Sequence, residues 1–205
     1  MNWLAHVFLS ESSIEFQLGN LLADVVRGSD RSSMSGEFLR GAQRHKAIDS
    51  FTDAHPVVRR SRLRLGPEHR RFSGVLVDVF YDYFLATRWE TYSAVSLDEF
   101  TATFYANVAI SGLQLPAPAQ RLVDGMVQHD LLGQYRSVRG VEESLRRLSL
   151  RLSARWNRNF ALEKSVPVLI ANAAALGDDF AEFFPELRLN VGAATAAVPG
   201  QVDDA

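Results

Sequence analysis

Apolar residues recur every three or four positions along most of this chain. In residues 72–89, Val75, Val79 and Tyr83 fall on one stripe, and residues 140–156 repeat leucine at the same spacing. This period is typical of amphipathic helices, whereas strands alternate apolar and polar residues. No alternating stretch of useful length occurs in the sequence. The pattern predicts an all-α fold, a single-domain multi-helix bundle with about seven to nine helices.

Local signals place several helix boundaries. Ser96 precedes an apolar run and Glu99 follows three residues later, which predicts a capping box at the start of a helix over 97–109. A proline suits the first turn of a further helix over 166–183. Two loops are expected where glycine, serine or proline accumulates, at 28–36 and 113–120.

The composition is that of an ordinary globular chain. Of 205 residues, 47% are hydrophobic and 22% are charged, which predicts one domain over 1–190. The segment 191–205 lacks bulky residues and is expected to be a disordered tail. The absence of cysteine excludes disulfides and thiolate chemistry. No apolar run reaches about 18 residues and no secretory leader is recognisable, so we expect a cytoplasmic protein without a membrane partner.

Charge is distributed unevenly along a chain whose net charge is −2. Residues 59–71 hold six arginines and one acid, and residues 136–158 hold seven arginines and two acids. From residue 178 onward there are six acids and one arginine. Solvated helix faces would explain the basic runs as readily as a local anionic partner. Nucleic acid is a poor fit, because aromatic residues are not interleaved with the arginines and the whole chain is slightly acidic.

Histidines and aspartates stand within otherwise apolar segments. His45 and Asp49 are four residues apart, as are Asp78 and Asp82, so each pair shares one helix face. A buried carboxylate is costly unless it is paired, hydrogen-bonded or bound to a cation. We therefore predict a set of metal ligands, namely His6, Asp24, His45, Asp49, Asp78 and Asp82. Histidine with several carboxylates suits Mn²⁺, Mg²⁺ or Fe²⁺ better than structural zinc.

Each of these residues also has a simpler explanation. A lone His6 is more often a hydrogen-bonded core residue than a ligand, Asp24 can pair with the arginine three residues on, and Asp49 with a neighbouring lysine. Asp53 is expected at a helix end, before a turn. The other histidines stand in polar or turn-like contexts and are expected at the surface, namely His55, His69 and His129. The paired spacings on two helices favour the metal site.

Four segments follow one another along the first half of the chain. They read MNWLAHVFLS, GNLLADVVRG, RHKAIDSFTDAHPVVRRSR and RRFSGVLVDVFYDYFLATRW. Together they resemble the acyl carrier protein phosphodiesterase family. The resemblance is strong over residues 1–92, and a closing FFPEL segment stands at 183–187, whereas residues 93–180 carry little motif content. Four ordered motifs at matching spacing are far more specific than any one of them.

The resemblance implies a helical fold like that of HD-type metal-dependent phosphohydrolases. Members of the family hydrolyse holo-acyl carrier protein, a small acidic protein, to the apo-carrier and 4′-phosphopantetheine, typically with Mn²⁺. The motif positions matched here are Asn2, His6, Asn20, Asp24, His45, Asp49, Asp78 and Asp82, with Arg44, Arg70 and Arg71 as basic motif positions.

Roles follow for several residues of this chain. Asp24 or Asp78 is expected to serve as general base, and Arg70 and Arg71 are expected to neutralise phosphate charge. Arginines that would bind the substrate or steer an acidic carrier protein are Arg44, Arg59, Arg60 and Arg62.

One position departs from the family pattern. Tyr83 follows Asp82 where the family usually has histidine. If that histidine is a ligand or proton donor, its replacement makes this protein slow, inactive or altered in specificity; if it only flanks the site, tyrosine replaces it without loss. Two other functions therefore stay open from the sequence. One is a metal-dependent phosphohydrolase of a small phosphodiester or nucleotide, and the other is a helical protein that binds the carrier without cleaving it.

Overall fold

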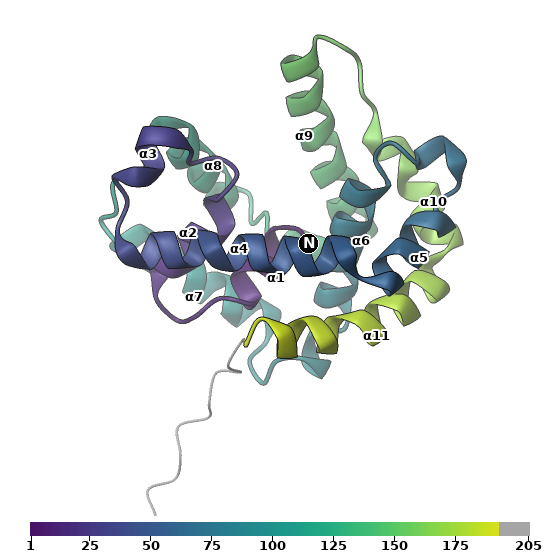
Figure 1. The fold of residues 1–205 in the computed structure, drawn as a ribbon, viewed down its shortest axis with the longest axis horizontal. Coiled ribbons are helices and arrows are strands. Elements are labelled where there is room, and N and C mark those ends of the chain that lie inside the picture. The colour runs from purple at the N-terminus through teal and green to yellow at the C-terminus, as the bar shows by residue number, and fades with distance from the viewer. Residues whose placement is uncertain (193–205) are drawn as a thin grey trace, which may run out of the picture.

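The computed structural model describes residues 1–192. Within that range the chain forms eleven α-helices and four 3₁₀ helices and no strand (Figure 1). The α-helices are α1 (Trp3–Phe8), α2 (Ile14–Leu22), α3 (Gly28–Ser32), α4 (Gly36–Ala54), α5 (Pro56–Arg64), α6 (Ser73–Thr87), α7 (Leu97–Ile110), α8 (Ala117–Gln128), α9 (Val138–Trp156), α10 (Val166–Ala171) and α11 (Ala173–Asn190). The 3₁₀ helices are η1 (Pro67–His69), η2 (Trp89–Thr91), η3 (Gly133–Arg136) and η4 (Leu162–Ser165).

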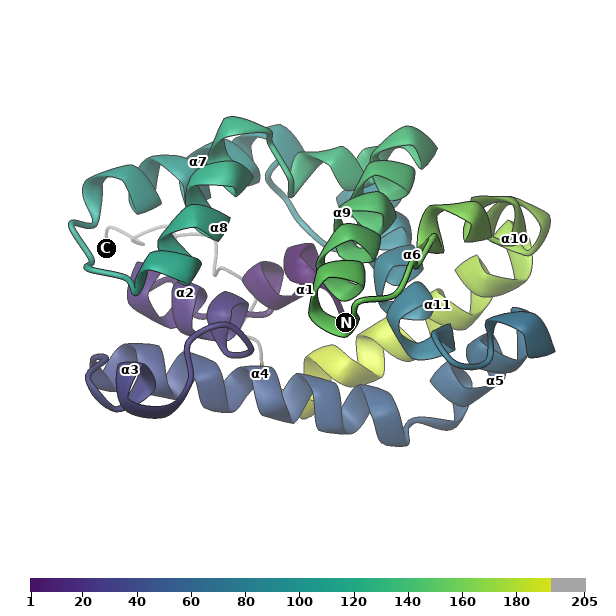
Figure 2. The same ribbon diagram turned by 90° about the horizontal axis from the view of Figure 1, so that it is seen from above.

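Helices α2 and α4 pack directly against each other along one flank of the molecule (Figure 2). Two glycines allow this approach. A Cβ on Gly19 would lie 2.0 Å from the carbonyl oxygen of Phe38, and a Cβ on Gly41 would lie 2.0 Å from the carbonyl oxygen of Phe16. Any side chain is therefore excluded at both positions. The two backbones are therefore in contact, and Asn20, which follows Gly19, lies against α4.

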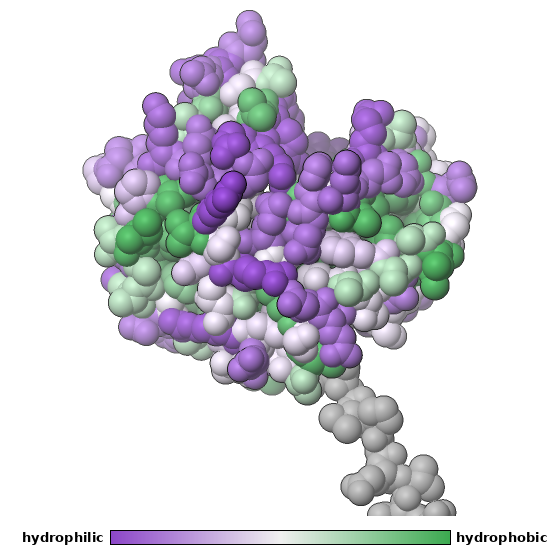
Figure 3. Space-filling model, turned by 180° about the vertical axis from the view of Figure 1, so that it is seen from behind, coloured by the Kyte–Doolittle hydropathy of each residue, from purple (hydrophilic) through white to green (hydrophobic). Residues whose placement is uncertain are grey.

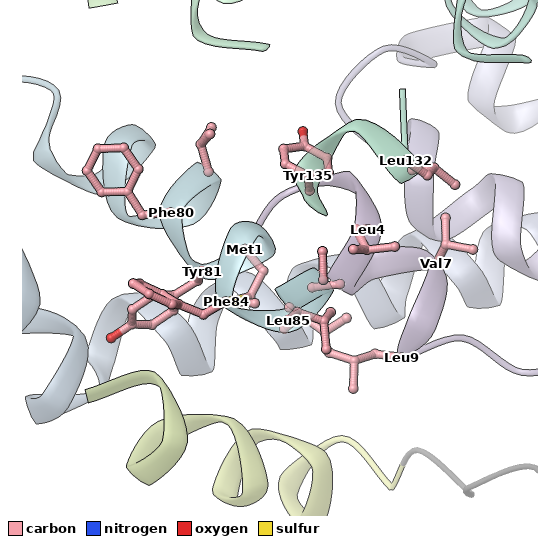
Figure 4. Close-up of a cluster of buried hydrophobic side chains, with 14 of the residues drawn as sticks. Met1, Leu4, Val7, Leu9, Phe80, Tyr81, Phe84, Leu85, Leu132 and Tyr135 are labelled. Carbon is pink, nitrogen blue, oxygen red and sulfur yellow. The ribbon is translucent and has the colours of Figure 1, made fainter. Parts of the chain in front are cut away.

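Helix α6 runs through the main core. Figure 4 shows its apolar side chains among those of α1 and η3, and the labelled residues of α6 are Phe80, Tyr81, Phe84 and Leu85. Helix α11 also packs on α6 and buries Phe183 and Phe184 of the FFPEL segment. Full burial of a large apolar side chain stabilises the fold by about 1.5–3 kcal/mol. Packing on α6 therefore fixes the positions of α1 and η3, both of which border the site described below.

The all-α prediction is confirmed, and so is Ser96 as the N-cap of α7, because Ser96 Oγ accepts a hydrogen bond from the Glu99 amide at 3.1 Å. The prediction of one helix over 166–183 is wrong. Asn172, whose side chain donates to the Val168 carbonyl at 3.0 Å, separates α10 from α11. Residues 28–32, expected in a loop, form the single helical turn α3. Short helices of this kind raise the number of helices above the expected range.

The segment expected to be disordered begins inside the fold, because Val191 is 8% exposed. The rest of that expectation, over 193–205, lies outside the described residues. Among the helices of the described range, none combines the length and the apolar character needed to span a bilayer.

Candidate active site

Two histidines and an aspartate meet between α1 and α4. His6 Nε2 lies 3.3 Å from Asp49 Oδ1, and His45 Nε2 lies 3.1 Å from Asp49 Oδ2. The imidazole rings stack with centroids 4.1 Å apart and an interplanar angle of 17°. Both histidines are buried, whereas the Asp49 side chain is 39% exposed. The two rings therefore point from a buried wall toward a partly open carboxylate.

Asn20 of α2 orients both rings. Its Oδ1 lies 2.9 Å from His6 Nδ1, and its backbone carbonyl oxygen lies 2.6 Å from His45 Nδ1. The Asn20 Nδ2 group donates to the His6 carbonyl and to Ser10 Oγ, at 2.7 and 2.9 Å, which assigns Oδ1 as an acceptor. Both imidazoles therefore donate through Nδ1 and present Nε2 to Asp49. Metal-ligating histidines are commonly held in this way by an outer residue.

The buried Nε2 atoms of His6 and His45 form no hydrogen bond of favourable geometry, although each lies within 3.3 Å of an Asp49 oxygen. An unpaired buried polar atom costs roughly 1–3 kcal/mol, so two of them side by side require an explanation. Ligand atoms of His6, His45 and Asp49 all lie within 4.8 Å of one another. The nitrogen–oxygen separations of 3.1 and 3.3 Å suit neighbouring ligands on an octahedral ion with bonds of about 2.1 Å. These residues fit a divalent cation.

The electrostatics of the group favour added positive charge. Burial lowers the pKa of His45, but the carboxylates of Asp24 and Asp49 outweigh burial and raise it to about 9. Burial also lowers the pKa of His6. Although burial favours the neutral form of Asp49, the two imidazoles hold its pKa well below the usual range. A proton on His45 balances the carboxylates here, and a divalent cation would do so in the same place.

Asp24 and Asp78 extend this group toward a pocket of about 210 Å³ that both of them line. Asp24 Oδ2 lies 3.6 Å from His45 Nε2. Asp78 Oδ1 lies 3.0 Å from the α-amino nitrogen of Met1, which in turn lies 3.7 Å from Asp49 Oδ1. Residues from η3 and α9 complete the lining, namely Tyr135, Ser144, Arg147, Leu148 and Arg151. Carboxylates and guanidinium groups therefore share one cavity.

The model of the family described as "Acyl carrier protein phosphodiesterase" matches residues 1–187. The chain belongs to this family. It is 30% identical to the acyl carrier protein phosphodiesterase of Serratia proteamaculans over 189 residues, which are 91% of this chain and 95% of that protein. The protein of the same name from Escherichia coli O6:H1 is 32% identical over 191 residues, with the same coverage.

A more local match joins the chain to the acyl carrier protein phosphodiesterase of Pectobacterium atrosepticum. The two are 40% identical over 89 residues, which span 43% of this chain and 46% of the relative. No solved structure matches the chain. The expected likeness to HD-type enzymes therefore stays a prediction.

Asp82, expected from the family motif to be a ligand, lies outside the histidine group and holds α1 instead. Its oxygens accept hydrogen bonds from the amides of Leu4 and Ala5 at 2.8 and 3.2 Å, and it is fully buried. Burial raises the pKa of Asp82 to about 7, although these hydrogen bonds act in the opposite direction. Because α1 carries His6, the contacts of Asp82 position a candidate ligand.

Asp24 differs from its expected surroundings. Its apolar neighbours in the sequence suggested burial, yet its side chain is 75% exposed and lies 3.6 Å from Arg27, the simpler pairing considered above. Exposure at the pocket makes Asp24 accessible to a substrate. Asp53 lies in the last turn of α4, as predicted for a helix end.

The arginines expected to bind the substrate do not line this pocket. Arg60 pairs with Asp179 and Glu182 at 2.7 and 2.5 Å, and Arg62 pairs with Asp53 at 2.5 Å. Arg44 lies 3.7 Å from Glu11, and the Arg71 guanidinium lies over the rings of Phe72 and Phe160. Arg59 and Arg70 are exposed. None of the six is among the residues that line the pocket in the described part of the chain.

Arg147 and Arg151 of α9 are the pocket arginines that sequence reasoning missed. The Arg147 Nε atom lies 3.3 Å from Glu143, and the Arg151 guanidinium lies 5.2 Å from the centre of the Trp3 ring. A signal existed in the sequence, because residues 144–158 contain five arginines and no acid. Nothing in the sequence, however, places that segment beside Asp24 and Asp78.

Three further residues singled out from the sequence have a clear place in the structure. His55, predicted at the surface, is 8% exposed; it accepts a hydrogen bond from the Val57 amide as the cap of α5, and its Nε2 lies 3.2 Å from Glu186. The surface prediction holds for His129. Tyr83 packs edge-on against Phe84 at 5.3 Å and is not among the pocket residues of the described range.

Proposed function

We propose that this chain is a metal-dependent phosphodiesterase that converts holo-acyl carrier protein to apo-carrier and 4′-phosphopantetheine. The observation that carries the proposal is the pair of Nε2 atoms of His6 and His45, which converge on Asp49 beside a pocket without forming hydrogen bonds of favourable geometry. The relatives are named acyl carrier protein phosphodiesterases, which supports the choice of substrate. Mn²⁺ is the proposed metal, with Mg²⁺ and Fe²⁺ as alternatives of similar ligand preference.

His6, His45 and Asp49 would hold the metal, with Asp24 and Asp78 beside it. A divalent cation bound there lowers the pKa of a coordinated water and polarises a phosphoryl oxygen. Asp24 is ionised near neutral pH, because its contact with His45 lowers its pKa, and it lines the pocket. It is therefore the first candidate to accept the proton of the attacking water, with Asp78 as the alternative.

Arg147 and Arg151 would bind the phosphate oxygens through charge-assisted hydrogen bonds. In this role they take the place of Arg70 and Arg71, which do not line the pocket. The remaining lining includes apolar side chains that would exclude water from the bound group, namely Trp3, Val75, Val79 and Leu148. The carrier serine would depart as its oxygen regains a proton.

Mass spectrometry of holo-carrier protein incubated with the enzyme and Mn²⁺ tests the proposal. We expect the carrier to lose the mass of phosphopantetheine, and we expect EDTA or the Asp78→Ala substitution to slow this loss strongly. A carrier of unchanged mass, together with hydrolysis of bis(p-nitrophenyl) phosphate, would favour a small-phosphodiester hydrolase. Carrier binding without any Mn²⁺-dependent product would instead identify a non-catalytic binding protein.

A further inference from the structure

The C-terminal end of α9 projects from the body of the protein (Figure 1). The last buried residue of this helix is Ser149, and beyond it Leu150 and Trp156 are 65% and 58% exposed. Seen from the opposite side, the projecting top of the molecule is mainly hydrophilic, with a few hydrophobic atoms among the polar ones (Figure 3). This end of the helix therefore contributes little to the core.

Arginines of α9 differ in their pairing. Arg146 and Arg147 lie 2.5 and 3.3 Å from Glu143, in the first half of the helix. Arg155 and Arg158, farther along, form no ion pair with any residue of the described range. The Arg155 guanidinium lies 5.8 Å from the centre of the Trp156 ring. The projecting end thus presents uncompensated positive charge next to an exposed aromatic ring.

This surface is continuous with the pocket. Arg147, Arg151 and Arg155 are spaced by four residues and so share one face of α9, and the first two line the pocket. Arg155 lies one turn farther along the axis, about 6 Å beyond Arg151. In the proposed reaction the bond to be broken joins phosphorus to a serine of a folded protein. That protein must therefore rest against a surface that adjoins the pocket.

We propose that the free end of α9 and the two residues after it, together residues 150–158, form the docking surface for the acidic carrier protein; this inference rests on the proposed function. Uncompensated arginines complement an acidic partner and steer its approach, while Trp156 offers a buried anchor once the partner is bound. An anionic membrane fits less well. Leu150 and Trp156 are six residues apart, about 120° around the helix, and form no common apolar face that could enter a bilayer.

The test compares two double charge reversals that change net charge equally. Arg155→Glu/Arg158→Glu alters the docking surface, and Arg121→Glu/Arg139→Glu alters exposed arginines on α8 and at the start of α9. Apo-carrier protein is the probe, because it lacks the scissile group and its binding can be measured by fluorescence anisotropy whether or not hydrolysis occurs. Circular dichroism checks folding, and Arg155→Gln/Arg158→Gln serves as a milder second variant.

We expect the docking reversal to raise Kd about 10-fold or more and to flatten the salt dependence of binding, while the control reversal leaves both within about twofold. Equal losses in the two reversals, or no loss in either, would overturn the docking surface while leaving hydrolysis of holo-carrier as a separate result. Arginine-dependent binding to phosphatidylglycerol vesicles without carrier binding would also overturn it. Carrier binding that depends on Arg155 and Arg158 in a protein unable to hydrolyse holo-carrier would support docking and refute the proposed function.

Discussion

Asp179 in α11 and Asp49 in α4 are both carboxylates that lie among nitrogen-bearing side chains, but only Asp179 has a complete set of hydrogen-bond partners. Asp179 is 1% exposed and accepts hydrogen bonds from Arg60, Arg64 and Ser61 at 2.7–2.8 Å. Around Asp49, in contrast, two histidine nitrogens form no hydrogen bond of favourable geometry, and the neighbouring carboxylates border a pocket.

The difference is the one we expect between a structural charge cluster and a cluster that binds a ligand. A buried charge that is fully paired within the fold contributes to stability and has no free valence for a ligand. A cluster whose nitrogen ligand atoms are not satisfied within the fold, at the edge of a cavity, can bind a cation or a substrate. Substitutions in the two clusters should therefore act on different properties of the protein.

The largest effect is expected for His45→Ala, which removes a proposed ligand from the cluster around Asp49. Loss of an outer-shell partner alone typically costs about 10–100-fold in affinity or activity, so loss of a direct ligand should slow carrier hydrolysis by more than about 100-fold. The measurement is the initial rate by mass spectrometry. A rate within a few-fold of wild type would place the metal elsewhere.

In the cluster around Asp179, Asp179→Ala should lower the free energy of unfolding by roughly 1–2 kcal/mol, because it removes the buried carboxylate that accepts hydrogen bonds from Arg60, Arg64 and Ser61. Metal affinity should not change. Urea unfolding monitored by circular dichroism gives the stability, with Asp178→Ala, at an exposed neighbouring position, as the matched control. Equal destabilisation by the two substitutions would contradict a specific role for Asp179.

Asn20→Ala should weaken metal binding about 10–100-fold, because Asn20 accepts from His6 Nδ1 and so fixes the direction of Nε2. Ser10→Ala is the control, since it removes only one of the two hydrogen bonds that Asn20 donates. Isothermal titration with Mn²⁺ distinguishes the two variants. Similar affinities in both would mean that the asparagine serves packing alone.

Acid should reduce the stability that the cluster around Asp179 contributes. Burial raises the pKa of Asp179, but the hydrogen bonds from Arg64, Ser61 and Arg60 outweigh burial and lower it below its usual range. Its contribution to stability is complete above the unfolded-state pKa of about 3.9 and is lost as pH falls through the lower folded-state pKa. Between pH 5 and pH 3 the unfolding free energy of wild type should fall more steeply than that of Asp179→Asn. Parallel curves in urea titrations would contradict this.

The smallest effect is expected for Tyr83→His, which restores the residue usual in the family. Tyr83 packs on Phe84 outside the pocket, so the rate of carrier hydrolysis should change by less than about threefold, within the range of a surface substitution. A gain of about tenfold or more, measured in the same mass-spectrometric assay, would show that this position takes part in the reaction.

Much of the architecture follows from local signals in the sequence. The apolar period predicts α6 and α9, and Ser96 as N-cap marks the start of α7. The break at Asn172 was missed because the apolar pattern continues through it, and α3 was missed because one turn of helix carries no periodicity. Boundaries of this kind depend on side-chain contacts that a pattern does not contain.

The part of the candidate site that could be predicted consists of residues that share one helix face by their spacing in the sequence. His45 and Asp49 share a face by their spacing, and the family motif adds His6. The pairing of α5 with α11 was not predictable, because Arg60 and Asp179 lie 119 positions apart. Two arginine-rich segments of similar composition therefore looked alike, although only the one in α9 lines the pocket.

The central claim is that His6, His45 and Asp49 bind a divalent metal. Electron paramagnetic resonance tests it directly, because the signal of free Mn²⁺ disappears on binding. Titration of wild type should reveal one tight site, and the same titration of His45→Ala should show affinity weakened by more than about 100-fold, with Asp179→Ala unchanged. Equal Mn²⁺ affinity in wild type and His45→Ala would contradict the account.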